Sequence, residues 1–382
     1  MNLSWDSDLR GPACYQIQLP RKILFGPGRR SLLPELLPPG PVLIAAGRHS
    51  KERIEHELVP ALGNRPIRIV SDLAAEPPLG DVERLLKAGR EIGAASLIGW
   101  GGGSAIDAAK SAAALMPLPG SVADYFYGKR NIPGKGLFFA ALPTTAGTGA
   151  EITSNAVLRD PETGIKQSLR HPEMAADLAI VDPELTFDCP PGVSAASGFD
   201  ALTQAIESFL SRKADTFTLP LALQAAQLLF HRLREACAGD ESARTPVAEG
   251  SMLTAIAFSG SGLGAVHGIG HPLGSLLGVP HGVCCAVLLP TVLECNRDVA
   301  AERLALLAGK LLGPASGSRP DMLIDALRRL RADLGLPENF KAWKLAPEHY
   351  DFIVRNCRSG SMKSNPRDLS DDEVRRILES LS

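Results

Sequence analysis

The fold is decided by residues 96–110, which read SLIGWGGGSAIDAAK. A short β-prone run, Ser96–Trp100, ends in three glycines, and a helical pattern starts directly after them. Three glycines let the backbone turn sharply and approach an anion, because no Cβ stands in the way. The helix that follows offers free N–H groups and the positive end of its dipole, and Ser104 lies where it could cap that helix. The stretch predicts a strand, a tight turn and a helix that could hold a phosphate.

The glycines alone leave an alternative open, since a tight turn between a strand and a helix needs no ligand. The stretch matches neither the GxGxxG nor the Walker A pattern. A second polar turn, Pro143–Glu151, follows the β-prone run Leu137–Leu142 and carries Thr144, Thr145 and Thr148. Hydroxyls at the C-terminal end of a strand suit ribose or phosphate contacts in an open α/β sheet, although the same residues suit any loop.

The first half of the chain repeats the order of strand and helix. Helical patterns such as Lys51–Val59 and Val82–Ile92 lie between several β-prone runs. This repetition predicts a Rossmann-like parallel sheet with helices on both faces. The runs predicted as strands are Tyr15–Leu19, Lys22–Phe25, Val42–Ala46, Ile67–Val70, Ser96–Trp100, Leu137–Leu142 and Ala179–Val181.

The second half is predicted to be all-helical. From about Ser194 the β-prone runs disappear, and the change falls near the Pro-rich stretch Asp188–Gly192. We therefore predict a dinucleotide-binding α/β domain over residues 1–188 and a helical metal and catalytic domain over residues 189–382. The predicted helices are Ser194–Ser211, Leu219–Ala238, Val247–Ile269, Ala300–Leu312, Met322–Leu334 and Asp371–Ser380.

Composition and charge exclude several classes of function. The 382 residues carry 40 basic and 42 acidic side chains, which gives no electrostatic case for a nucleic-acid or membrane partner. Residues 1–6 are polar and acidic rather than a secretory leader, and the apolar stretches are too short to span a bilayer. We expect a cytoplasmic protein. Seven cysteines without a CxxC pattern argue against a disulfide framework, and the vicinal pair Cys284–Cys285 is expected in the core.

Three histidines predict a metal or catalytic site. His267 and His271 are four residues apart on a helical pattern and so share one face, and His281 follows a Pro turn that could fold it back toward them. Imidazole is the commonest protein ligand of divalent transition metals, although a single helical histidine is usually structural. Asp200 could supply a carboxylate, with Gln204 one turn further on the same face. Asp200 could instead be only a charge near a helix N-terminus.

Taken together, these segments resemble the iron-containing (group III) alcohol dehydrogenases of the dehydroquinate synthase-like superfamily. The matches follow the order of the family from about Lys22 to Arg367. The matching segments are Gly101–Ser104 with Asp107 and Lys110, Pro143–Gly149 with Glu151, Asp182–Leu185, Gly198–Thr203, the block of His267, His271 and His281, and Ser364–Arg367.

The resemblance implies an NAD(P)-dependent alcohol dehydrogenase or aldehyde reductase, expected to be a homodimer with Fe²⁺ or Zn²⁺. The implied metal ligands are Asp200, Gln204, His267 and His281, and His271 matches a non-ligand histidine near the nicotinamide that could relay a proton. The implied cofactor-binding residues are Gly102, Gly103 and Ser104 for the pyrophosphate, and Asp107, Thr144, Thr145, Thr148, Lys166 and Leu185 for other parts of the nucleotide.

Gln204 departs from the family pattern, because most members carry histidine at that position. An amide oxygen is a neutral and weaker ligand than imidazole. Three interpretations stay open: Asp200, His267 and His281 suffice with one open position, as in many catalytic zinc sites; Gln204 binds the metal weakly; or the enzyme has lost its metal, as in the maleylacetate reductase branch. A non-redox enzyme of the dehydroquinate synthase type is a further alternative, against which Asp200 and the sparse lysines argue.

The sequence constrains the nicotinamide cofactor more than the substrate. After the run Val42–Ala46 come Gly47 and Arg48, whereas NAD-specific members often carry Asp in place of Gly47 to bond the ribose 2′-OH. NADP is therefore admissible beside NAD. The substrate is expected to be a small alcohol or aldehyde. Arg358, Lys363 and Arg367 could face an anionic substrate, or could simply be solvated.

Overall fold

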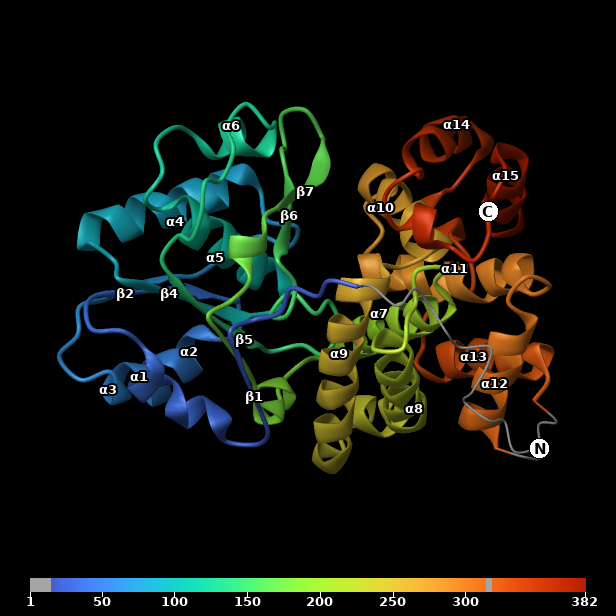
Figure 1. The fold of residues 1–382 in the computed structure, drawn as a ribbon, viewed down its shortest axis with the longest axis horizontal. Coiled ribbons are helices and arrows are strands. Elements are labelled where there is room, and N and C mark those ends of the chain that lie inside the picture. The colour runs from blue at the N-terminus through green and yellow to red at the C-terminus, as the bar shows by residue number, and fades with distance from the viewer. Residues whose placement is uncertain (1–14, 314–317) are drawn as a thin grey trace. The chain divides into compact units, whose positions relative to one another are not determined.

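The computed structural model describes residues 15–313 and 318–382 (Figure 1), so the predictions about residues 1–6 lie outside the described residues. The chain divides into two compact units. One contains Gln18–Thr145 and Gly149–Cys189, and the other contains Pro190–Ser382 together with Ala146–Thr148 and the described residues up to Ile17. Both short segments precede residue 188 in the sequence but group with the helical unit, which a single cut at residue 188 does not describe. The single domain boundary therefore stays a prediction.

The α/β unit is built on a six-stranded parallel sheet with the strand order β1-β8-β5-β4-β2-β3. Strands β2, β4 and β8 are buried along their whole length, as expected for parallel strands covered on both faces. The predicted Rossmann-like sheet is confirmed. The strands are β1 (Lys22–Phe25), β2 (Val42–Ala46), β3 (Ile67–Val70), β4 (Ser96–Gly101), β5 (Phe138–Pro143) and β8 (Leu178–Val181).

Alternate residues of one strand show how both faces of the sheet are covered. Leu43 and Ala45 of β2 belong to an apolar cluster formed with the helices α4 (Leu79–Ile92) and α5 (Gly103–Leu115). Val42, Ile44 and Ala46 belong to the cluster on the opposite face. The elements contributing to that second cluster are α1 (Leu33–Leu36), the π-helical turn η2 (Ile54–Leu58) and η4 (Pro183–Thr186). The shorter elements of the unit are η1 (Arg29–Leu32), α2 (Lys51–Arg53), α3 (Val59–Ala61), α6 (Val122–Phe126) and η3 (Pro172–Met174).

The strands of this half differ from the prediction in two places. Tyr15–Leu19 forms no strand; the Tyr15 ring instead packs against Phe217 of the helical unit, with 5.8 Å between ring centroids. An antiparallel pair, β6 (Asn155–Arg159) and β7 (Lys166–Arg170), was missed. These two strands form a separate two-stranded sheet, joined to the rest of the unit by an isolated bridge between Arg159 and Pro78, and β7 is mostly polar, so the apolar pattern of a buried strand is absent from it.

The second unit is helical, as predicted. Its apolar core draws side chains from nearly every helix, and the helices α7, α8 and α9 pack against one another. The helices are α7 (Pro191–Leu210), α8 (Thr218–Cys237), α9 (Glu241–Ser261), α10 (Ala265–Leu277), α11 (His281–Asn296), α12 (Ala301–Leu312), α13 (Pro320–Asp333), α14 (Pro347–Asn356) and α15 (Asp371–Ser380), with the short turns η6 (Lys341–Trp343) and η7 (Met362–Ser364).

The helix predicted over Val247–Ile269 is wrong, because two helices occupy that range. Gly262 takes φ +68° after α9 and Gly264 is extended before α10, so the helical hydrogen bonding stops between them. Helices α11 and α14 were not predicted; α11 is buried almost all round and lacks an amphipathic pattern. Among the described residues no single helix is long and apolar enough to cross a membrane, and α9 with α10 passes that test only as a pair bent by 103°.

Candidate metal centre and nucleotide-binding loop

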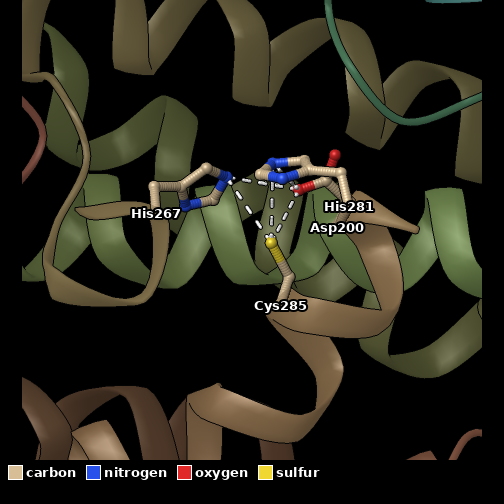
Figure 2. Close-up of side chains that lie close together, drawn as sticks. All are labelled: Asp200, His267, His281 and Cys285. Carbon is tan, nitrogen blue, oxygen red and sulfur yellow. Dashed lines mark hydrogen bonds and ion pairs between the residues drawn. The ribbon is translucent and has the colours of Figure 1, made fainter. Parts of the chain in front are cut away.

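Four side chains of the helical unit gather their donor atoms in one place (Figure 2). Asp200 comes from α7, His267 from α10, and His281 and Cys285 from α11. One ligand atom from each lies within 4.8 Å of all the others. The predicted fold-back of His281 is confirmed, since its ring centroid lies 5.2 Å from that of His267. The structure thus brings together a carboxylate, two imidazoles and a thiol.

A close approach of two helices places His281 beside Asp200. His281 is the first residue of α11, directly after Pro280. The next residue is Gly282, where a Cβ atom would lie only 2.1 Å from the backbone oxygen of Ala196 in α7. Only glycine permits this contact, and it holds the N-terminus of α11 against α7. Cys285 lies four residues after His281 and therefore on the same face of α11.

Glu207 orients His267 from behind. Its Oε2 lies 2.6 Å from Nδ1 of His267, and its Oε1 accepts a 2.7 Å hydrogen bond from the Val266 N–H. With the Nδ1 proton donated to this carboxylate, Nε2 keeps its lone pair and faces Asp200 Oδ1 at 3.2 Å. Such a carboxylate–histidine pair is the usual partner arrangement of a metal-ligating imidazole. Sequence reasoning missed Glu207, although it lies seven residues after Asp200 on the same helix face.

The acid–base properties of the cluster follow from burial and mutual contact. Burial alone would lower the pKa of His267, but neighbouring Cys285, Glu207 and Asp200 outweigh it and raise that pKa well above its usual value. Burial would raise the pKa of Asp200, yet His281 and His267 lower it. Burial raises the pKa of the Cys285 thiol to about 12. Asp200 is thus held ionised beside the two imidazoles, and a metal cation binding there would displace the imidazole proton.

The remaining residues predicted for the metal site have distinct places. Asp200 lies in the middle of α7, so its alternative reading as a charge near a helix N-terminus is wrong. Gln204 is buried one turn further on, and its Oε1 has no hydrogen-bond partner within the described ranges. His271 lies outside the donor cluster, with its ring stacked on that of His281 at 4.9 Å and 9°. His271 thus stands beside the candidate metal and not among its donors.

Cys285 is the donor that sequence reasoning missed. The pair Cys284–Cys285 is buried, as expected, but the two thiols differ in surroundings. Cys284 Sγ faces the Val279 carbonyl at 3.8 Å, whereas Cys285 Sγ lies 3.3 Å from Asp200 Oδ1. The four-residue spacing from His281 was the available signal.

The glycine turn between β4 and α5 lies at the carboxyl ends of three strands. Gly47 N donates to Trp100 O at 2.8 Å, and Thr144 N donates to Gly101 O at 3.0 Å. A Cβ at Gly101 would lie 2.9 Å from Gly47 Cα, so both glycines are required for this approach. The ends of β2, β4 and β5 therefore bring Gly47, the glycine turn and Thr144 together, as an open α/β sheet does at a nucleotide site.

The prediction that Ser104 caps α5 is wrong. Helix α5 begins at Gly103, the N-cap is the extended Gly102, and no side chain caps it. Ser104 lies one residue inside the helix, where its hydroxyl accepts a 3.2 Å hydrogen bond from the Glu76 N–H. The Glu76 carboxylate also forms an ion pair with Lys166 at 2.6 Å. Glu76 therefore contacts Ser104 through its backbone and Lys166 through its side chain.

Three other residues of the predicted nucleotide site lie apart from the glycine turn or make packing contacts. Asp107 Oδ2 accepts from the Val157 N–H of β6 at 3.0 Å, and Leu185 is buried in the core of η4. Thr148 belongs to the short segment grouped with the helical unit. Their assignment to the cofactor stays a prediction, as does that of Arg48, which is exposed directly after β2.

The basic residues near the C-terminus are largely occupied by protein partners. Arg358 pairs with Asp371 and donates to Leu369 O, and Arg367 donates to Cys295 O and Glu373. The structure gives these two guanidinium groups a role in holding the C-terminal segment. It offers no support for an anionic substrate at Arg358 and Arg367.

The fold and the site define a class of protein. A parallel α/β unit with a glycine turn at the carboxyl ends of its strands is the architecture of dinucleotide-binding enzymes. A buried cluster of imidazoles, a carboxylate and a thiol suits a divalent transition metal. Together they place the chain in the class of nucleotide-dependent enzymes with a candidate metal centre.

The comparisons with known proteins identify the family. Residues 20–183 match the iron-containing alcohol dehydrogenases, and residues 194–382 match the C-terminal part of the Fe-containing alcohol dehydrogenase family. The chain belongs to this family. It is accordingly an oxidoreductase acting on CH–OH groups with a nicotinamide cofactor and a metal.

Individual relatives agree with this assignment over most of their length. The chain is 36% identical over 323 residues to long-chain-alcohol dehydrogenase 1 of Geobacillus thermodenitrificans, covering 82% of this chain and 81% of that one. It is 30% identical to the NADPH-dependent butanol dehydrogenase of Clostridium saccharobutylicum, with coverage of 94% and 96%. Among solved structures, an alcohol dehydrogenase from Oenococcus oeni has a TM-score of 0.90 at 30% identity, with coverage of 97% and 100%.

Proposed function

We propose that the chain catalyses reversible hydride transfer between a small aliphatic alcohol or aldehyde and NAD(P), assisted by a divalent metal. The observation that carries this proposal is the cluster of Asp200, His267 and His281 in the helical unit of an iron-containing alcohol dehydrogenase. In the oxidative direction the C–H hydride goes to C4 of the nicotinamide and the hydroxyl proton is released.

The residues present fit a metal. Asp200 offers a carboxylate oxygen, and Glu207 leaves the Nε2 lone pair of His267 available. The buried Oε1 of Gln204, without a hydrogen-bond partner among the described residues, is a further oxygen donor within the same helix face. When bound, the metal supplies a Lewis acid for the substrate oxygen. A metal-free reductase would have no use for these donors, so we favour the metal-assisted reaction.

The chain's own residues would hold the reacting groups and the proton. Glu207 keeps the His267 ring in one orientation, so the groups that surround the substrate oxygen would be held in place before the reaction. His271 stacks on His281 and is partly exposed, which suits it to take up the hydroxyl proton and pass it to solvent. The cofactor supplies the redox chemistry, and the protein supplies position and field.

For the cofactor, we propose NADP as the preferred form. Gly47 provides no carboxylate to bond a ribose 2′-OH or to repel a 2′-phosphate, and the exposed Arg48 follows it. The Clostridium relative carries NADPH in its name, whereas the related sulfoacetaldehyde reductase from Bifidobacterium kashiwanohense was solved with NAD⁺. The glycine turn, with Gly102 and Gly103, would receive the pyrophosphate at the N-terminus of α5.

For the substrate, we propose an uncharged aliphatic aldehyde or its alcohol. Relatives include a 1-propanol dehydrogenase and the butanol dehydrogenase, and the guanidinium groups of Arg358 and Arg367 already have protein partners. A homodimer and a cytoplasmic location, expected from the resemblance and the composition, stay predictions.

The test is oxidation of NADPH and NADH with short, acidic and aromatic aldehydes, on protein stripped of metal and then resupplied with Fe²⁺ or Zn²⁺. We expect activity to return with metal, to be faster with NADPH, and to favour uncharged aldehydes. Activity that ignores the metal would support the metal-independent reductase. Binding of nucleotide without any turnover would refute the proposed function.

A further inference from the structure

Cys285 is the donor of the cluster to which the proposed reaction gives no role. Its thiol is fully buried, yet its sulfur lies 3.3 Å from Asp200 Oδ1, 3.8 Å from His267 Nε2 and 3.7 Å from His281 Nε2. Packing of the apolar core explains burial but not this direction, because the neighbouring thiol of Cys284 faces a backbone carbonyl instead. The sulfur faces the same three atoms that would hold a metal (Figure 2).

Five of the six separations between the donor atoms match those of a tetrahedral zinc site. Zn–N and Zn–O bonds of about 2.0–2.1 Å and a Zn–S bond of about 2.3 Å place nitrogen and oxygen donors about 3.3 Å apart, and sulfur about 3.6 Å from each of them. The three sulfur distances are 3.3, 3.8 and 3.7 Å, and Asp200 Oδ1 lies 3.2 and 3.7 Å from the two imidazole nitrogens. These five separations fall within about 0.4 Å of the tetrahedral values.

Of the four donor side chains, that of His281 is the most exposed to solvent. The side chains of Asp200 and His267 are 3% and 2% exposed, and Cys285 is fully buried, whereas that of His281 is 26% exposed. A thiolate would thus hold the metal from the interior of the helical unit. The side of His281, on which His271 stacks, stays available to a substrate oxygen as an added position.

We propose that Cys285, as a thiolate, is the fourth protein ligand of the catalytic metal, and that the site consequently prefers zinc to iron. This inference rests on the proposed metal-assisted function. Binding replaces the S–H bond with a metal–sulfur bond and releases the proton to solvent. A thiolate beside two imidazoles is a softer donor set than one with only nitrogen and oxygen, which favours zinc. In this arrangement Gln204 is not needed as a ligand.

The first test replaces the metal with Co²⁺ in the full-length protein, without oxygen, and records the absorption spectrum. A cobalt–thiolate bond gives a sulfur-to-cobalt charge-transfer band in the near ultraviolet, and nitrogen and oxygen ligands do not. We expect one Co²⁺ per chain and this band in the wild type, in Cys284→Ala and in Gln204→Ala. We expect no band in Cys285→Ala or Cys285→Ser. Since the band is read in the wild type, a poorly folding Cys285 variant would not spoil the test.

The second test offers equimolar Fe²⁺ and Zn²⁺ to metal-free protein and measures the metals bound. We expect the zinc-to-iron ratio to fall at least about tenfold in Cys285→Ser and to stay unchanged in Cys284→Ala. Cobalt bound without the charge-transfer band would overturn the role of Cys285 while leaving the metal-assisted function intact. Failure to bind any metal would overturn both.

Discussion

Glu207→Gln is the change that most directly tests how the metal centre is held together. In the wild type both carboxylate oxygens accept, one from the Val266 N–H at 2.7 Å and the other from His267 Nδ1 at 2.6 Å. An amide has only one accepting oxygen. If that oxygen stays with Val266, the NH₂ group faces Nδ1 and drives the imidazole proton to Nε2, the atom turned toward Asp200. If it turns to His267, two donors face each other at Val266.

Either arrangement weakens the lone pair offered to the metal. Loss of such an outer partner costs about tenfold to a hundredfold in metal affinity, or about 1.4–2.7 kcal/mol. The assay is Zn²⁺ competition against a chromophoric chelator, with folding checked by circular dichroism. Asp215→Asn is the control, because Asp215 is also a buried carboxylate of the helical unit that accepts two N–H bonds, and its two donors, Phe217 and Thr218, do not belong to the metal cluster. A zinc affinity of Glu207→Gln within about twofold of the wild type would refute the reasoning.

Three further predictions follow from the same structure. Gly282→Ala should lower the free energy of unfolding in urea by about 1–3 kcal/mol and weaken metal binding, because its Cβ would lie 2.1 Å from Ala196 O. Gly192→Ala, with open space around the new Cβ, should change neither the unfolding free energy nor the metal affinity. Burial raises the pKa of the Glu151 carboxyl from 4.5 to about 7, so the stability contributed by its protonated form is present below pH 4.5 and lost as the pH rises through about 7. The free energy of unfolding should therefore fall between pH 4.5 and 7, and should fall less in Glu151→Gln. An equal dependence of unfolding free energy on pH in both proteins would contradict this. Arg48→Ala should raise KM for NADPH more than for NADH, and a parallel change in both would remove Arg48 from the 2′-phosphate site.

Local patterns in the sequence were sufficient for most of the α/β unit. Strands β2, β4, β5 and β8 are runs of mostly buried residues, and the glycine turn after Trp100 is a local feature that needs no distant partner. The hairpin of β6 and β7 was missed because β7 is mostly polar, and because part of the support of the hairpin comes from α5. Lys110 lies fully buried and donates to the carbonyls of Ala150, Thr153 and Asn155, which no local pattern reveals.

In the helical unit, too, features with a local pattern were predicted and features without one were missed. The four-residue spacing of His267 and His271 placed both on one face, and α10 carries them there. The break between α9 and α10 was missed, because the apolar residues on either side of residues 262–264 fit one continuous helical pattern. The backbone at Gly262, with φ +68°, is not helical and ends α9. Helix α11, buried on almost every side, lacks the polar face that would reveal a helical period.

Residue patterns were enough to predict the six parallel strands, the glycine turn, and the residue types able to bind a metal. Which side chains meet became visible in the packed helices: Glu207 contacts Nδ1 of His267, and the thiol of Cys285, not that of Cys284, lies beside Asp200. The difference lies in how far along the sequence each kind of interaction reaches. Helical and strand periodicity acts over a few residues, whereas the meeting of α7, α10 and α11 depends on contacts across more than sixty positions, such as the close approach of Gly282 to Ala196.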